Sequence, residues 1–186
     1  MRSTAEARRA VLLDRAVAVF ARNGYHATPV TAVAAAAGIS EAYALRLFTN
    51  KLGLFTAAVE TCYDRILETL ETAAATAPDP DPDKVLQHLG DAYANLIADK
   101  NLLMLQVHAQ SVSDVPEIKA TVRAGYKRLV AFLRQAGADD GQIQLFIAYG
   151  QLCHLIVTAG LDDVDDSWAR ALTAGMTHVS HHDEAR

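Results

Sequence analysis

Apolar residues recur three or four positions apart along almost the whole chain, which is the spacing of one face of an α-helix. No segment alternates apolar and polar residues in the manner of a half-buried strand. The pattern therefore predicts an all-α fold of about nine helices. Capping and turn residues between the apolar stripes indicate where each helix begins and ends.

Three helices are expected before residue 50. A capping-box pattern at residues 3–6 opens the first, and Gly24 ends it because glycine adopts the left-handed conformation that follows a helix. Thr28 is expected to cap the second helix, and Gly38 to end it. Ser40 then caps a third helix. A helix, a glycine-containing turn and another helix make up the helix-turn-helix pattern.

Longer helices follow. Asn50 caps the fourth, which ends before a linker at residues 76–84, where three prolines exclude a helix interior. Apolar stripes predict five further helices at about residues 86–97, 102–110, 116–135, 140–158 and 164–179. The eighth helix is apolar on two sides, so both sides are expected to be covered. We expect it to form a homodimer interface with the last helix, and Ile156 is the test position if it lies on the outer side.

The composition is that of a protein with a sizeable core, with 51% hydrophobic residues and a mean hydropathy of +0.09. No run of about 18 uninterrupted apolar residues is present, so a membrane span is not expected. Charges interrupt the apolar positions near the N-terminus, which argues against a secretory signal. Cys62 and Cys153 lack metal-ligand spacing, so we expect free thiols in a cytoplasmic protein without a metal or cofactor.

The net charge of −5 is distributed unevenly along the chain. Residues 1–55 contain seven basic and three acidic residues, a balance of +4, and the remaining residues carry −9. This asymmetry suggests an N-terminal module that faces a polyanion, joined to an acidic body. A chance fluctuation in the charge pattern is the alternative explanation.

The third helix leaves a small set of side chains outside the expected core. Ala42 and Arg46 point away from the core, and Tyr43 and Leu45 lie on the flanks. A cation and a phenol on the exposed face of such a helix suit contacts to phosphates and to base edges. Exposure to solvent without any DNA contact is the alternative for these side chains.

The same region carries a recognisable set of residues at fixed spacings: Phe20, Gly24, Tyr25, Thr28, Val30, Val33, Ala34, Ala37, Gly38, Ile39, Ser40, Phe48, Lys51 and Leu54. In these positions the chain resembles the TetR family of bacterial repressors. The resemblance is strong over residues 8–56 and only architectural beyond them. It implies a helix-turn-helix DNA-binding domain at residues 1–52 and a helical ligand-binding and dimerisation domain at residues 53–186.

The resemblance also implies a set of DNA contacts. The residues expected to face the groove are Glu41, Ala42, Tyr43 and Arg46, and those expected to face phosphates are Thr28, Thr31, Ser40 and Lys51. Three positions depart from the family pattern. Ala42 replaces a usual Gly or Pro, Leu45 replaces a Tyr that anchors a phosphate, and Leu47 often corresponds to His. Tyr43 is expected to take part of the anchoring role.

In the TetR family a cavity among the fourth to eighth helices holds the effector. The partly polar positions that could contact it here are Tyr63, Tyr93, Met104, His108, Tyr126, Phe146, Tyr149 and His154. Ordinary core packing is the alternative for each of these side chains. The basic residues of the seventh helix, Arg123, Lys127 and Arg128, fall mostly on its polar side. We therefore expect a neutral or weakly charged, largely hydrophobic effector.

The resemblance implies a homodimer that binds a near-palindromic operator in double-stranded DNA and is released by a small hydrophobic or amphipathic effector. The alternative is a helical ligand-binding or protein-interaction module that no longer reads DNA. The sequence has no nucleophile elbow and no glycine-rich phosphate loop. An enzyme is therefore not expected.

Overall fold

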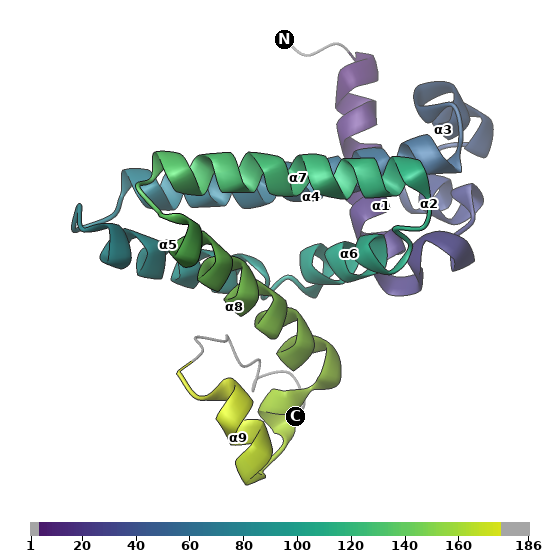
Figure 1. Cartoon of the computed structure of the whole chain (residues 1–186). Coiled ribbons are helices and arrows are strands. Elements are labelled where there is room, and N and C mark those ends of the chain that lie inside the picture. Colours follow the sequence, from purple (N-terminus) through teal and green to yellow (C-terminus); the bar gives the residue numbers. More distant parts are fainter. Residues whose placement is uncertain (1–3, 176–186) are drawn as a thin grey trace. The chain divides into compact units, whose positions relative to one another are not determined.

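The structure is a computed structural model that describes residues 4–175 (Figure 1). In this range it contains helices and no strand, which confirms the all-α prediction. The helices are α1 (Thr4–Ala27), α2 (Val30–Ala36), α3 (Glu41–Phe48), α4 (Lys51–Ala75), α5 (Pro82–Leu96), α6 (Lys100–Ser111), α7 (Pro116–Gln135), α8 (Asp140–Ala159) and α9 (Ser167–Thr173). A 3-10 turn, Leu161–Asp163, lies between the last two.

The chain divides into two compact units. Unit 1 consists of Met1–Arg65 and Asn101–Arg128, and unit 2 of Ile66–Lys100 and Leu129–Arg186. The long helices α4 and α7 each contribute to both units. Unit 1 contains α1, α2, α3 and α6, and unit 2 contains α5, α8 and α9.

The core of unit 1 forms around aromatic side chains at the end of α1 and the start of α4. Phe20 and Phe55 are fully buried and meet edge to face, with ring centroids 4.9 Å apart. The Tyr25 ring lies 5.0 Å from that of Phe55. Helices α2 and α3 follow one another at an angle of 104°, with Val33 and Ala34 buried between them and α1. This arrangement is the expected helix-turn-helix.

The predicted helix break at Gly24 is present inside α1, whereas the prediction for Thr28 is wrong. Gly24 adopts φ 71° and ψ −179°, which interrupts the regular helix without ending the element. The Thr28 hydroxyl donates to the Gly24 carbonyl over 2.7 Å and is completely buried. It therefore does not cap α2, whose preceding residue, Pro29, provides no side-chain cap.

Helices α4, α6 and α7 pack closely in unit 1. A side chain on Gly125 would place its Cβ 2.4 Å from Tyr63, so only glycine allows this approach of α7 to α4. Tyr126 lies beside Tyr63, and its hydroxyl accepts a 2.9 Å hydrogen bond from Gln110 of α6. Arg128 pairs with an aspartate of α4 over 2.6 Å. Polar contacts thus flank the close approach of α4 and α7.

Two predicted boundaries in unit 2 differ from the structure. The linker ends at residue 81, because Pro82 occupies the first turn of α5, where a missing N–H costs no hydrogen bond. The Asp81 carboxylate accepts from the two following amides and caps the helix. The last helix begins at Ser167, since Asp166 caps it there. Residues 176–179 of the predicted last helix lie outside the described residues.

Candidate nucleic-acid interface and ligand cavity

Helix α3 presents its polar side chains to solvent. The Ser40 hydroxyl accepts a 3.2 Å hydrogen bond from the Tyr43 amide, which confirms the predicted cap. Ala44 and Phe48 are buried and pack α3 against the rest of unit 1, so the opposite side of α3 faces outward. The residues on that side are Glu41, Ala42 and Arg46, which are exposed, and Tyr43, which is half-buried.

The sequence interpretation missed a cation from another helix. The Arg8 guanidinium of α1 lies 5.8 Å from the centre of the Tyr43 ring, and that of Arg46 lies 4.6 Å from it. The Arg8 side chain, by its hydrogen bond, is the main cause that lowers the pKa of Tyr43, and Arg46 adds to it. The excess of arginines near the N-terminus is visible in the sequence, but it does not indicate which arginine contacts α3.

Lys51 lies at the start of α4 and is held in place. Its Nζ donates to the His26 carbonyl over 3.0 Å and lies 4.9 Å from the centre of the Tyr25 ring. The side chain is half-buried. Its ammonium group has three donor hydrogens, and the His26 carbonyl accepts one of them. Thr31 and Ser40 are exposed. The Thr28 hydroxyl is buried and donates to the Gly24 carbonyl, so in this conformation it is not available to a phosphate.

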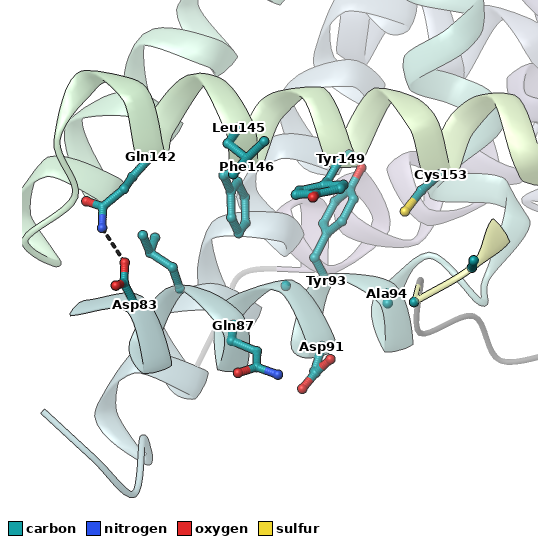
Figure 2. A pocket seen from close by; sticks show the side chains of 15 residues that line it. Asp83, Gln87, Asp91, Tyr93, Ala94, Gln142, Leu145, Phe146, Tyr149 and Cys153 are labelled. Atoms are coloured by element: carbon teal, nitrogen blue, oxygen red, sulfur yellow. Dashed lines mark hydrogen bonds between the residues drawn. The ribbon is translucent and has the colours of Figure 1, made fainter. Parts of the chain in front are cut away.

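A cavity of about 520 Å³ lies between α5 and α8 in unit 2 (Figure 2). Its lining residues are Asp83, Leu86, Gln87, Gly90, Asp91, Tyr93, Ala94, Gln142, Leu145, Phe146, Tyr149, Gly150, Cys153, Ala174 and Gly175. Figure 2 shows Tyr93 and Phe146 in the space between the two helices, while Gln87 and Asp91 extend away from α8. The Gln142 amide donates to Asp83 over 2.5 Å and closes one end. The volume suits a small organic molecule.

The eight residues predicted to contact an effector are divided between the two units. Tyr93, Phe146 and Tyr149 line the cavity of unit 2. The other four in unit 1 are Tyr63, Met104, His108 and Tyr126, none of which lines this cavity. His108 instead donates from Nε2 to the Ala21 carbonyl over 3.1 Å. The lining residues Gln87 and Gln142 were not predicted, because polar residues on a helix look solvent-facing in a sequence, and Asp83 was not predicted because it lies in the expected linker.

The eighth predicted residue, His154, lies beside the cavity without lining it. Its Nε2 is hydrogen-bonded to the Tyr93 hydroxyl over 3.0 Å, so it positions a ring that does line the cavity. Burial lowers the pKa of His154 to about 4, which keeps the imidazole neutral at pH 7. Burial also raises the pKa of the Cys153 thiol to about 11. These side chains therefore add no charge to the wall.

Charge on the cavity wall has one sign. Asp83 and Asp91 are the charged residues of its lining, although the Asp91 side chain extends away from α8, and neither lysine nor arginine lines the cavity among the described residues. The described part of unit 2 contains thirteen acidic and four basic residues, a net charge of −9. The corresponding part of unit 1 contains eleven basic and seven acidic residues, a net charge of +4. Unit 1 is thus net cationic and unit 2 net anionic.

Helix α8 leaves a row of apolar side chains uncovered. Leu145 and Leu155 are 55% and 48% exposed, and Leu152 between them is half-buried. By length and composition α8 is the one described helix that could cross a membrane on its own. The same properties are found in helices buried inside soluble proteins or between their subunits.

Comparison with known proteins identifies the N-terminal module. Residues 12–58 match the family model described as bacterial regulatory proteins, tetR family. No curated protein matches the chain. Solved structures match almost its whole length, among them the fatty acid degradation regulator FadR from Bacillus halodurans, with 19% identity, a TM-score of 0.67, and 96% of this chain and 99% of that one covered.

Two further structures have the same fold. The transcriptional regulator FadR from Bacillus subtilis, in complex with stearoyl-CoA, has 19% identity and a TM-score of 0.66, with 90% of this chain and 99% of that one covered. A TetR-family transcriptional regulator from Bordetella parapertussis 12822 has 18% identity and a TM-score of 0.63, with 95% and 98% covered.

The fold and the family match define a helix-turn-helix module of the kind found in tetR-family bacterial regulatory proteins. More specifically, that module is TetR-like, and the chain as a whole has the fold of solved TetR-family regulators.

Proposed function

We propose that this protein is a ligand-responsive repressor that binds a near-palindromic operator as a homodimer and is released by a small, largely hydrophobic effector. The observation that carries the proposal is the outward face of α3, where Glu41, Ala42, Tyr43 and Arg46 stand on a TetR-type helix-turn-helix. We assign DNA binding to residues 1–52, and effector binding and dimerisation to residues 53–186.

Each exposed side chain of the helix-turn-helix is assigned a role by its chemistry. Arg46 can pair with a guanine edge in the major groove, and Glu41 can accept from a cytosine amino group. Thr31, Ser40 and Lys51 surround the recognition helix and would contact phosphates, which fix the register without reading sequence. The positive balance of unit 1 supports association with a polyanion.

The uncovered face of α8 supports a homodimer. Leu145, Leu152 and Leu155 follow the alternating spacing of three and four residues, completed by Ala148 and Ala159, that packs one helix against another. A second copy of the same helix offers an identical apolar row, as a two-fold interface requires. Exposing this row to water is unfavourable, because burial of apolar surface contributes roughly 25 cal/mol per Å² of favourable free energy.

The cavity of unit 2 supports an effector that is neutral or singly positive. Aromatic rings line it, and the Asp83 carboxylate at one end attracts cations and repels anions. The regulator from Bacillus subtilis has been solved with stearoyl-CoA, a polyanionic ligand whose phosphates require cationic partners. No lysine or arginine lines this cavity among the described residues, so its wall offers no cationic partner for such phosphates.

Purified protein is expected to bind a duplex from the region upstream of its own gene more tightly than a shuffled duplex of equal length by roughly 1,000-fold or more, which is the lower end of the margin that specific sites show. The affinity for both duplexes should fall steeply with salt, because binding releases counterions. Fluorescence anisotropy at several salt concentrations measures both effects. Equal affinity for the two duplexes at every salt concentration would favour a helical module that no longer reads DNA.

Effector class can be tested with matched amphiphiles. We expect a long-chain alkyl amine or alcohol to raise the melting temperature and to weaken operator binding, and the corresponding acyl-CoA to do neither. Phe146→Asp should abolish the stabilisation, because it places a carboxylate in the apolar part of the wall. Calorimetry with and without operator must show that the operator weakens effector binding by the same factor by which the effector weakens operator binding. Stabilisation by acyl-CoA alone would contradict the proposed ligand class.

A further inference from the structure

We propose that Arg8 of α1 contacts the DNA backbone. Tyr43 links Arg8 to the recognition helix, so that the Arg8 and Tyr43 side chains bind one phosphate together. The inference rests on the proposed DNA-binding function and adds a residue outside the helix-turn-helix itself. It assigns to the first turns of α1 a part in operator binding.

The contacts between α1 and α3 carry the inference. Arg8 and Arg46 both approach the Tyr43 ring, at 5.8 Å and 4.6 Å from its centre. The next residue of α1, Arg9, lies 4.6 Å from the centre of the Phe48 ring at the end of α3. Two successive arginines of α1 therefore stack on two aromatic rings of α3, which fixes the position of Arg8 beside the outward face of the recognition helix.

The arginines at this site lack the partners that other arginines of unit 1 have. Arg65 pairs with Asp14 over 2.9 Å, and Arg128 pairs with Asp64 over 2.6 Å. Neither Arg8 nor Arg46 has a carboxylate within ion-pair distance among the described residues. Both side chains are exposed. Two guanidinium groups that share one aromatic ring and no anion form a site of concentrated positive charge.

The chemistry of this site suits a phosphodiester. A guanidinium donates two parallel hydrogen bonds to phosphate oxygens. The Tyr43 hydroxyl can accept from Arg8 while donating its own hydrogen outward, and its lowered pKa reflects contact with Arg8 first and Arg46 second. Arg8 and Tyr43 together provide a pair of donors for one phosphate.

Arg8 and Arg46 are expected to differ in what they read. Arg46 belongs to α3, so its guanidinium can enter the groove with the helix and stacking on Tyr43 limits its rotamers. Arg8 reaches the same ring from α1, at the edge of the recognition helix, where the phosphate backbone borders the groove. Loss of Arg8 should therefore weaken binding to all sequences alike.

The experiment compares Arg8→Ala, Arg8→Lys and Tyr43→Phe with the matched control Arg123→Ala. Arg123 is an exposed arginine of α7 in the same unit, so its loss changes the net charge equally. Anisotropy titrations use the upstream duplex and its shuffled form at four salt concentrations. Circular dichroism melting checks that each variant remains folded.

We expect Arg8→Ala to weaken binding to both duplexes on the order of 10- to 100-fold, because the dimer loses two charge-assisted contacts. The slope of log affinity against log salt should fall in magnitude by about 2, which is roughly 0.9 for each lost contact. Arg8→Lys should keep the slope, and Tyr43→Phe should keep it while reducing affinity, since neither removes a charge. Arg123→Ala should match the wild type.

Two results would overturn the inference. If wild-type protein binds DNA and Arg8→Ala matches it in affinity and slope, Arg8 contacts no phosphate. If Arg8→Ala removes the preference for the upstream duplex while keeping its affinity for the shuffled one, Arg8 reads bases and not the backbone. Absence of DNA binding by the wild type would instead refute the proposed function, and this inference with it.

Discussion

Leu155→Arg is expected to convert the protein into a monomer and to lower its affinity for operator DNA by more than 100-fold. Leu155 lies in the uncovered apolar row of α8 and is 48% exposed in the protomer. An arginine there would bring two like charges together across a two-fold interface and leave them without partners. A monomer can dock only one half-site, so it loses the second set of contacts. Sedimentation at micromolar concentration and anisotropy measure the two effects.

The choice of Leu155 corrects the position expected from the sequence. Ile156 has no exposed surface, so it packs inside the protomer and is not on the outer side. Ile156→Arg should therefore lower the free energy of unfolding by several kcal/mol, since it buries an unpaired charge. Ala131→Arg places the same charge on an exposed position of α7 in unit 2 and is the matched control. If Leu155→Arg sediments as a dimer like this control, the interface lies on another face.

The helices and the helix-turn-helix could be predicted because their signals are local. Ser40 and Asn50 accept from amides three residues ahead, as capping side chains do. Gly24 adopts a positive φ at the position where the sequence indicated a helix end. Periodicity over long windows then placed α7 and α8 to within a residue or two.

Side-chain partners from distant elements could not be predicted in the same way. Arg8 meets Tyr43 only because α1 crosses beside α3, and periodicity does not determine that crossing. Thr28 looked like a cap, but the helix break at Gly24 frees a carbonyl four residues earlier for its hydroxyl. The cavity residue Asp83 sits next to Pro82, in a stretch that reads as a linker.

The predicted effector contacts show a further limit of periodicity. It identifies which face of a helix is apolar but not which cavity that face adjoins. Tyr63 and Tyr126 therefore looked like Tyr93 and Tyr149, although the first pair packs together in unit 1 and the second lines the cavity of unit 2. His154 looked like a ligand contact, and the structure places it behind Tyr93 as a neutral hydrogen-bond partner.

Selection from a random duplex library tests most directly whether the protein is a dimeric, sequence-specific DNA-binding regulator. Purified protein would be incubated with the library near physiological salt, and the bound duplexes sequenced over successive rounds. We expect an inverted repeat to be enriched, with half-sites about one helical turn apart, 34–36 Å, or somewhat more. Its affinity should exceed that for random duplex by roughly 1,000-fold or more. Arg46→Ala should select the same repeat with one position relaxed in each half-site. Enrichment of no sequence, or of a single half-site without symmetry, would contradict a dimer that reads DNA through α3.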